Sequence, residues 1–285
     1  MKRRIKSFFS RIHKVINRPD MVLLPGQLAF FLVLAIIPTM TLITYTASTL
    51  NLSTQFLYDF LAKAFSKEVA NVMLSTSTAS NAGLKLTFVL IMCYYIASNG
   101  TSSVIVTSNS IYGIKNASWG KRRLKAILMA IILVLIVVFL LIVPIFGEKI
   151  MTLITTVNLN PYFTNLIAKV YFYLQNPLMW IILFLLIKLI YVLAPDRHIS
   201  SHNANYGAIF TTIAWILTTE LYSYYINHWA NYSALYGSLT SICVLMIWFY
   251  FISYFFVIGM SLNYQKESEE LENKEPVKEK KKKKQ

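Results

Sequence analysis

Charged side chains are scarce in this sequence, and acidic ones are the scarcest. Only 14% of the 285 residues are charged, and no more than 12 residues are Asp or Glu. A soluble globular domain carries charge on about a quarter of its residues. Because 56% of the residues are apolar, the composition argues against a soluble domain and indicates an integral membrane protein.

Cysteine and the common catalytic signatures are also lacking. The two cysteines, Cys93 and Cys243, lie inside apolar runs, so we expect neither a disulfide framework nor a zinc site. No HExxH, GxSxG, P-loop or Gly-rich dinucleotide pattern occurs. His198 and His202 beside Asp196 could share a metal on a helix, but the polarity of a short loop explains them better. We therefore expect no cofactor, no bound metal and no enzyme activity.

Long apolar runs are abundant. Six of them cover residues 22–48, 84–106, 125–147, 177–194, 204–227 and 235–264. Each is close to the ~20 residues that a helix needs to cross ~30 Å of hydrocarbon. We predict an all-α, polytopic transmembrane bundle with six spans over 22–265. Amphipathic patterns in 51–83 and 148–176 predict interfacial helices in the two long outer loops.

The basic residues indicate the orientation of this bundle. Six crossings place both termini on the same side. That side holds seven Lys or Arg residues before the first span, five in the second loop, one in the fourth loop and eight in the tail, against five on the opposite side. Such enrichment marks the cytoplasmic side. The net charge of +15 is therefore a topology signal, and we expect no nucleic-acid partner.

The two ends of the chain have different expected structures. Residues 1–21 alternate basic and apolar residues at helical spacing, which is typical of an amphipathic helix on anionic headgroups of the cytoplasmic leaflet. Membrane lipids are accordingly the expected partners. Residues 266–285 are rich in Glu and Lys without an apolar period, and we expect a disordered cytoplasmic tail.

Polar residues inside the spans are the candidates for a substrate-binding site, because polar groups are costly in hydrocarbon. The predicted cavity is lined by Gln27, Asn99, Glu220, Tyr236, Gly237 and Ser238. Asn99 lies in the polar turn 98–103, which is either a tight helix–helix seam or a water-lined segment. Such seams serve contacts within a chain and between copies equally well, so a homo-oligomer stays open.

Three stretches resemble one family of membrane proteins. They are Gln27–Phe31 with Pro38, Ala194–Arg197 with Gly207-Ala208, and Tyr232–Leu239 with Trp248 and Gly259–Asn263. In these stretches the chain resembles the YihY / virulence factor BrkB family, over about 22–265. The resemblance implies six spans, cytoplasmic termini and a cell-membrane location. Ser261 stands where the family usually has Glu, so a charge-dependent role at that position does not carry over.

Three functions are open at this point. A transporter or lipid-translocating protein of the cell envelope is the favoured one, because the polar residues lie inside the spans. The second is a scaffold that binds an envelope-assembly partner without transporting anything. The third is a membrane-anchored ribonuclease, a label long attached to the family, for which the sequence supplies no chemical reason.

Overall fold

The described part of the chain is helical and contains no strand. The structure is a computed structural model, and it describes residues 10, 12–17, 19–49, 55, 58, 83–136, 161–229 and 238–282. Five long helices are α2 (Asp20–Thr49), α5 (Gly83–Tyr112), α7 (Pro161–Leu193), α8 (Ser201–Trp229) and α10 (Ser238–Lys282). A further helix covers 119–136. The prediction of an all-α fold is thereby confirmed.

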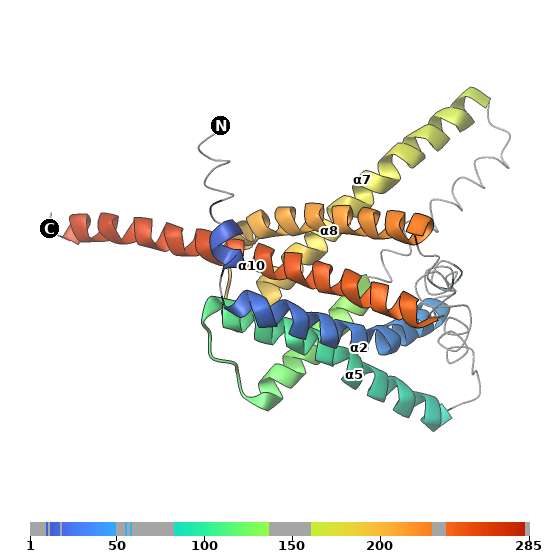
Figure 1. Ribbon diagram of the computed structural model, residues 1–285, viewed down its shortest axis with the longest axis horizontal. Coiled ribbons are helices and arrows are strands. Elements are labelled where there is room, and N and C mark those ends of the chain that lie inside the picture. Colours follow the sequence, from blue (N-terminus) through green and yellow to red (C-terminus); the bar gives the residue numbers. More distant parts are fainter. Residues whose placement is uncertain are drawn as a thin grey trace.

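The helices form one elongated bundle (Figure 1). α2 packs against α5 on one side and α10 on the other, α8 packs against α10, and α7 packs against α8. α2 and α8 begin at the end of the bundle where α5 and α7 finish, and α10 leaves the bundle at this same end (Figure 1). We call it the α10-exit end.

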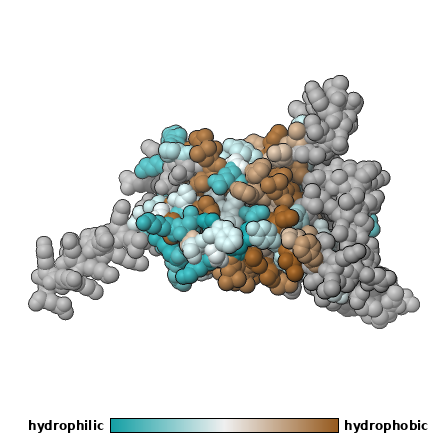
Figure 2. Space-filling view, turned by 90° about the horizontal axis from the view of Figure 1, so that it is seen from below, coloured by the Kyte–Doolittle hydropathy of each residue, from teal (hydrophilic) through white to brown (hydrophobic). Residues whose placement is uncertain are grey.

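Apolar surface surrounds the bundle. Large apolar side chains remain exposed on every long helix, among them Phe88, Trp180 and Leu221. Figure 2 shows apolar residues gathered over the middle of one face, with hydrophilic residues towards the α10-exit end. An exposed apolar surface of this extent is what a membrane-embedded protein presents to lipid. The protein is therefore membrane-embedded.

Fewer helices qualify as membrane spans than the sequence predicts. Among the described residues, Leu90–Tyr112 and Cys243–Ser268 are long and apolar enough, and the bent pair Met21–Ile36 and Pro38–Thr46 qualifies if it is one span. The apolar part of α7, Pro177–Leu193, is shorter. Residues 137–147 of the predicted third span lie outside the described residues, so two or three spans are shown and six remain a prediction.

Proline bends α2. The predicted first span, 22–48, nearly coincides with the helix, which begins at Asp20 and ends at Thr49. Pro38 lies inside it, where it removes one backbone hydrogen bond and clashes with the preceding turn. The two segments that meet at Pro38 differ in direction by 45°, as proline geometry requires inside a helix.

The polar turn at 98–103 is a helix–helix seam. α5 is continuous through these residues, and a Cβ added to Gly100 would lie 3.1 Å from the Ala35 Cβ of α2. On another face, Thr101 donates a hydrogen bond of 2.6 Å to the Ala126 carbonyl of the 119–136 helix. Small residues permit this close approach. The seam interpretation is therefore the one that the structure supports.

Both ends of the chain differ in part from the sequence prediction. Val15 is fully buried and packs on the bundle core with Ile12, so this part of the segment contacts the protein itself. Beyond 265, α10 continues as a helix to Lys282 where we expected disorder. Glu and Lys are good helix formers, and a long preceding helix has already met the cost of nucleation.

Candidate functional site

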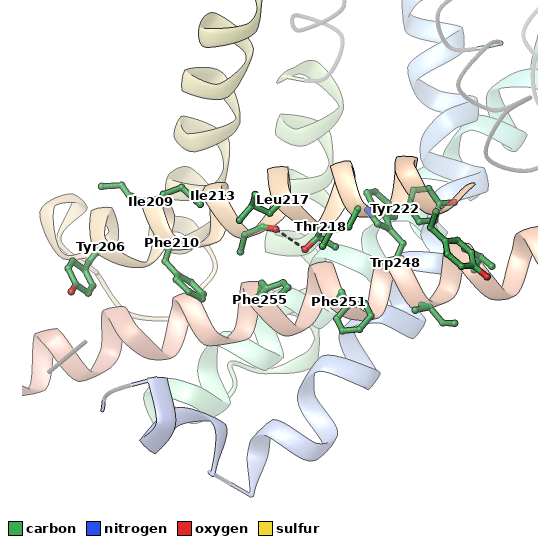
Figure 3. Close-up of a pocket in the computed structure, with 15 residues that line it drawn as sticks. Tyr206, Ile209, Phe210, Ile213, Leu217, Thr218, Tyr222, Trp248, Phe251 and Phe255 are labelled. Atoms are coloured by element: carbon green, nitrogen blue, oxygen red, sulfur yellow. Dashed lines mark hydrogen bonds between the residues drawn. The ribbon is translucent and has the colours of Figure 1, made fainter. Parts of the chain in front are cut away.

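A long apolar groove lies between α8 and α10 (Figure 3). Its volume is about 1010 Å³. Leu217 of α8 and Phe251 of α10 both belong to the middle part of its lining. Thr218 is a rare polar group there, and its hydroxyl is already bonded to the Ala214 carbonyl at 2.7 Å. The described residues that line it are Tyr206, Ile209, Phe210, Ile213, Ala214, Leu217, Thr218, Leu221, Tyr222, Tyr225, Val244, Ile247, Trp248, Phe251 and Phe255. Such a lining suits hydrocarbon rather than a hydrated solute.

Polar groups stand at both ends of the groove. Near the α10-exit end, the Lys266 ammonium lies 5.9 Å from the centre of the Tyr206 ring. At the opposite end, the Tyr222 and Trp248 rings are 5.5 Å apart. The Tyr222 hydroxyl and the Trp248 Nε1 are both buried without a hydrogen-bond partner in the described part of the chain. Two hydrogen-bond donors at that end therefore remain unsatisfied within the described residues.

Two glycines let α8 and α10 touch beside the groove. A Cβ on Gly207 would overlap the Gly259 carbonyl oxygen and would lie 2.7 Å from the Asn263 amide. The Asn263 Oδ1 accepts a hydrogen bond of 2.6 Å from the Gly207 backbone N–H. Backbone-to-backbone contact of this kind is possible only where neither residue has a side chain. The crossing therefore fixes the position of one wall of the groove against the other.

Hydrogen bonds to carbonyl groups of α10 hold this crossing. The buried Tyr191 hydroxyl of α7 donates to the Phe256 carbonyl at 2.8 Å and lies 2.6 Å from the Thr211 hydroxyl of α8. Trp215 donates from its indole N–H to the Ile252 carbonyl at 2.9 Å. Because water cannot satisfy these groups in hydrocarbon, each bond is retained only if the helices stay together.

A second polar site lies at the α10-exit end, where Asp196 joins three segments. Its Oδ2 accepts hydrogen bonds from the Asn109 side chain at 2.7 Å and from the Ala117 backbone N–H at 3.2 Å. Its Oδ1 pairs with the Lys125 ammonium at 2.8 Å. The Asp196 backbone N–H in turn donates to Asn109 Oδ1 at 2.8 Å. We call this group the Asp196 junction.

A glycine cap brings the loop 113–118 to the junction. Gly113 has φ of 64°, a left-handed conformation that favours glycine. The Ile114 N–H bonds to the Asn109 carbonyl at 2.8 Å and the Gly113 N–H to the Ser110 carbonyl at 3.2 Å. This is the Schellman arrangement that ends a helix. It turns the chain so that Ala117 reaches the carboxylate.

The junction keeps Asp196 ionised. Partial burial alone would raise the pKa of this carboxyl group, but hydrogen bonds from Lys125, Asn109 and the Ala117 amide outweigh it, and the pKa lies below its ordinary value. Lys125 also donates to the Ala194 and Pro195 carbonyls, each at 2.8 Å. Its ammonium group is therefore fully engaged in fixing the loop that follows α7.

The part of α10 near residue 265, where the helix leaves the bundle, contacts the same loop. Arg197 donates to Glu267 at 2.6 Å, and its guanidinium lies 5.0 Å from the centre of the Tyr112 ring. The Tyr112 ring makes an edge contact with Tyr264, with centroids 5.5 Å apart. The loop after α7 thereby contacts both α5 and α10 at the α10-exit end.

Comparison with known proteins identifies the family. The family model of the virulence factor BrkB matches residues 12–284. The chain belongs to the BrkB family. A ribonuclease-like protein of Bacillus subtilis (strain 168), YfkH, is 32% identical over 209 residues, which cover 71% of this chain and 74% of that relative. No solved structure shows a significant match.

Two of the three stretches that resemble the BrkB family contain described residues that hold helices together. Ala194–Arg197 forms the loop of the Asp196 junction. Gly207 and Gly259 are the two contact glycines of the α8–α10 crossing. Ser261, at the position where the family usually has Glu, is buried with 1% of its surface exposed. These BrkB stretches therefore fix the geometry of the bundle.

The six predicted site residues are not brought together in the described structure. Asn99 is half-buried on α5, where its Oδ1 accepts a hydrogen bond of 2.7 Å from Arg123. Gln27 on α2 and Glu220 on α8 have exposed side chains. Tyr236 and Gly237 lie outside the described residues, and Ser238 is the first residue of α10. None of these residues is among the described lining of the groove, and the shared cavity stays a prediction.

Sequence reasoning missed the Asp196 junction and the groove. The sequence offers Asp196 only as a possible metal ligand beside His198 and His202. The described residues contain no group of three or more His, Cys, Asp or Glu that could hold a metal. Lys125 is one of the five basic residues of the predicted second loop, and in the sequence it indicates only the orientation of the bundle. The available signal was the Pro-Asp-Arg loop, since a carboxylate beside a predicted span needs a cationic partner.

Proposed function

We propose that this protein is a six-span protein of the cytoplasmic membrane that moves a lipid between the leaflets along the α8–α10 groove. The observation that carries the proposal is the length of the groove. On α8 its lining runs from Tyr206 to Tyr225, which at 1.5 Å per residue is about 28 Å. This is close to the ~30 Å thickness of the hydrocarbon. A groove that only held one acyl chain within a single leaflet would need about half of that length.

The ends of the groove support this proposal. A lipid that changes leaflets must carry its polar headgroup past apolar surface, and polar groups at both mouths lower the cost of entry and exit. Lys266 and Tyr206 stand at one mouth, and the unpartnered donors of Tyr222 and Trp248 at the other. The apolar wall between them suits the acyl chains, which stay in contact with the bilayer.

The arrangement of the helix ends supports the proposed topology. α2 begins and α10 leaves at the same end of the bundle (Figure 1), as an even number of crossings requires. The basic residues Lys115, Lys121, Arg122 and Lys125 follow α5 at this end. By the enrichment of Lys and Arg on the cytoplasmic side, we place the α10-exit end and both termini in the cytoplasm.

Blocking the groove should stop translocation. Leu217→Trp places a larger side chain in the middle of the groove, and we expect it to slow translocation at least tenfold without lowering the unfolding temperature. The measurement is the transfer of a fluorescent phospholipid across proteoliposomes, followed by chemical quenching. Leu128→Trp on the 119–136 helix is the matched control, because Leu128 is exposed to a similar extent, 52% against 58%. Equal rates in both variants and the wild type would refute the groove as the path.

Glu220 is a second test in the same assay. It is exposed on α8 beside the groove residues Leu217 and Leu221, and an ionisable group among such neighbours is a functional candidate. We expect Glu220→Gln to abolish translocation and leave folding and insertion intact, with Thr219→Val as the control. Wild-type translocation by this variant would remove Glu220 from the proposal. If the wild-type protein itself translocates no lipid in this assay, the result favours the scaffold function.

A further inference from the structure

Arg123 reaches into the region of a membrane span on the side of the bundle away from the groove. It lies on the 119–136 helix, which crosses α5 obliquely (Figure 1). Its Nη1 donates to Asn99 Oδ1 at 2.7 Å and its Nη2 donates to the Tyr95 carbonyl. Its Cζ lies 3.6 Å from the centre of the Tyr95 ring. Three interactions therefore fix the plane of the guanidinium.

Both acceptors belong to the candidate span Leu90–Tyr112. The span predicted from the sequence, 84–106, places the inner end of the hydrocarbon at residue 106. Asn99 then lies about 10 Å and Tyr95 about 16 Å along the helix from that end. A charged group at such a depth is costly, and arginine keeps its charge there. The position thus needs a compensating anion more than a surface arginine does.

The protein supplies no such anion among its described residues. The groups that Arg123 contacts are an amide oxygen, a backbone carbonyl and an aromatic ring, and all three are neutral. The carboxylates of Asp196 and Glu267 pair with Lys125 and Arg197 instead. The Nε of Arg123 is buried and has no hydrogen-bond partner in the described part of the chain. Two of the five guanidinium N–H donors are used within the protein, so the second N–H of each terminal nitrogen and the full positive charge remain for a ligand.

The surroundings of Arg123 show what kind of ligand would fit. Large exposed side chains lie within four positions of Tyr95 on α5 and of Arg123 on the 119–136 helix: Ile91, Met92 and Ile96 on the first, and Trp119 and Leu124 on the second. Arginine matches phosphate oxygens with its planar fork of donors. A ligand with one phosphate and long apolar chains would satisfy both the guanidinium and this surface.

We propose that Arg123 binds the phosphate of an anionic phospholipid from the cytoplasmic leaflet, whose acyl chains cover the exposed surface of α5. Asn99 and Tyr95 orient the guanidinium and leave the second N–H of each terminal nitrogen to the lipid. This site does not depend on translocation, since none of Arg123, Asn99 and Tyr95 is among the described residues that line the groove. A protein that moved no lipid could still hold one here.

Native mass spectrometry of the full chain, with phosphatidylglycerol added stepwise, tests the proposal. We expect Arg123→Gln to lose one bound phosphatidylglycerol, with binding at this site weakened about tenfold. Arg122→Gln is the matched control, because it removes the same charge from the neighbouring position, and it should bind as the wild type does. Phosphatidylcholine should bind more weakly than phosphatidylglycerol to the wild type, since its headgroup carries a compensating cation.

Several outcomes would overturn the proposal. If Arg123→Gln and Arg122→Gln lose equal amounts of bound phosphatidylglycerol, the lipid is attracted to basic charge in general. If both variants bind it as the wild type does, no site exists at Arg123. Displacement of the lipid by millimolar inorganic phosphate would assign the site to a soluble anion instead. If Arg123→Gln does not fold, Arg123→Lys keeps the charge without the planar fork, and it should bind with intermediate affinity. Wild-type binding by the Lys variant would contradict recognition by the guanidinium.

Discussion

Gly259→Ala is expected to destabilise the bundle by about 3 kcal/mol or more, since strain in a packed core that cannot relax is costly. A methyl group at this position would overlap the Thr211 hydroxyl, and it would lie 2.5 Å from the Tyr191 hydroxyl and 2.8 Å from the Gly207 carbonyl oxygen. The two hydroxyls are bonded to each other and to α10, and the third group is backbone. No neighbour can therefore move away without breaking a hydrogen bond or separating the helices.

Thermal unfolding in mild detergent measures this effect, and a second glycine serves as the control. No atom lies within 4 Å of a Cβ added to Gly26 in α2. Gly26→Ala should therefore be neutral or stabilising by up to about 1 kcal/mol, because alanine is the better helix former. Similar unfolding temperatures for the two variants would contradict the close contact of α8 and α10 at Gly259.

Asp196→Ala is expected to cost about 2–3 kcal/mol. The Asp196 and Lys125 side chains are largely shielded from water, with 13% and 28% of their surfaces exposed. Removing the carboxylate leaves the Lys125 ammonium, the Asn109 amide and the Ala117 N–H without their acceptor, and unpaired groups of this kind carry the full desolvation penalty. The measurement is a double-mutant cycle with Lys125→Met, for which we expect a coupling energy above about 1 kcal/mol.

The exposed ion pair at the same end of the bundle is the natural comparison. Arg197 and Glu267 have 39% and 16% of their side-chain surfaces exposed, and such pairs contribute about 0–1 kcal/mol. Glu267→Gln should therefore have a much smaller effect than Asp196→Ala. If the two substitutions cost the same, the Asp196 junction has no special role in joining the helices.

The junction also makes stability depend on pH. The pKa of Asp196 is lowered in the folded protein, so its contribution is complete above the pKa of the unfolded chain, about 3.9. It is lost as the pH falls through the lower pKa of the folded state. Part of the acid destabilisation of the wild type should accordingly be missing in Asp196→Asn.

The sequence predicts individual helices well where apolar runs are bounded by polar residues. The run 204–227 lies inside α8, Pro38 bends α2, and the turn 98–103 adopts the first of its two predicted structures, the helix–helix seam. These are local properties, because helix length and proline geometry depend on neighbouring residues. α7 differs: it begins at Pro161, in the predicted outer loop, because the amphipathic stretch there continues directly into the apolar run.

The polar contacts could not be predicted in the same way. Asn109 and Asp196 are 87 positions apart, and Lys125 and Asp196 are 71 apart. Their meeting depends on the Gly113 turn and on the oblique 119–136 helix, neither of which follows from periodicity. Asn99 lies inside a candidate span, as predicted. Its partner Arg123 is one of the five basic residues predicted to lie in the second, cytoplasmic loop. An oblique helix changes the depth that its side chains reach.

Photo-crosslinking of lipid to the wild-type protein tests the central claim most directly. The probe is a phospholipid with a diazirine at the middle of one acyl chain, incorporated into liposomes with the full chain, and the labelled residues are located by mass spectrometry. We expect labelling to concentrate on Ile213, Leu217 and Phe251 in the groove and to fall in Leu217→Trp. Labelling of the groove no stronger than that of the exposed residues Leu128 and Ile132 would contradict a lipid path between α8 and α10.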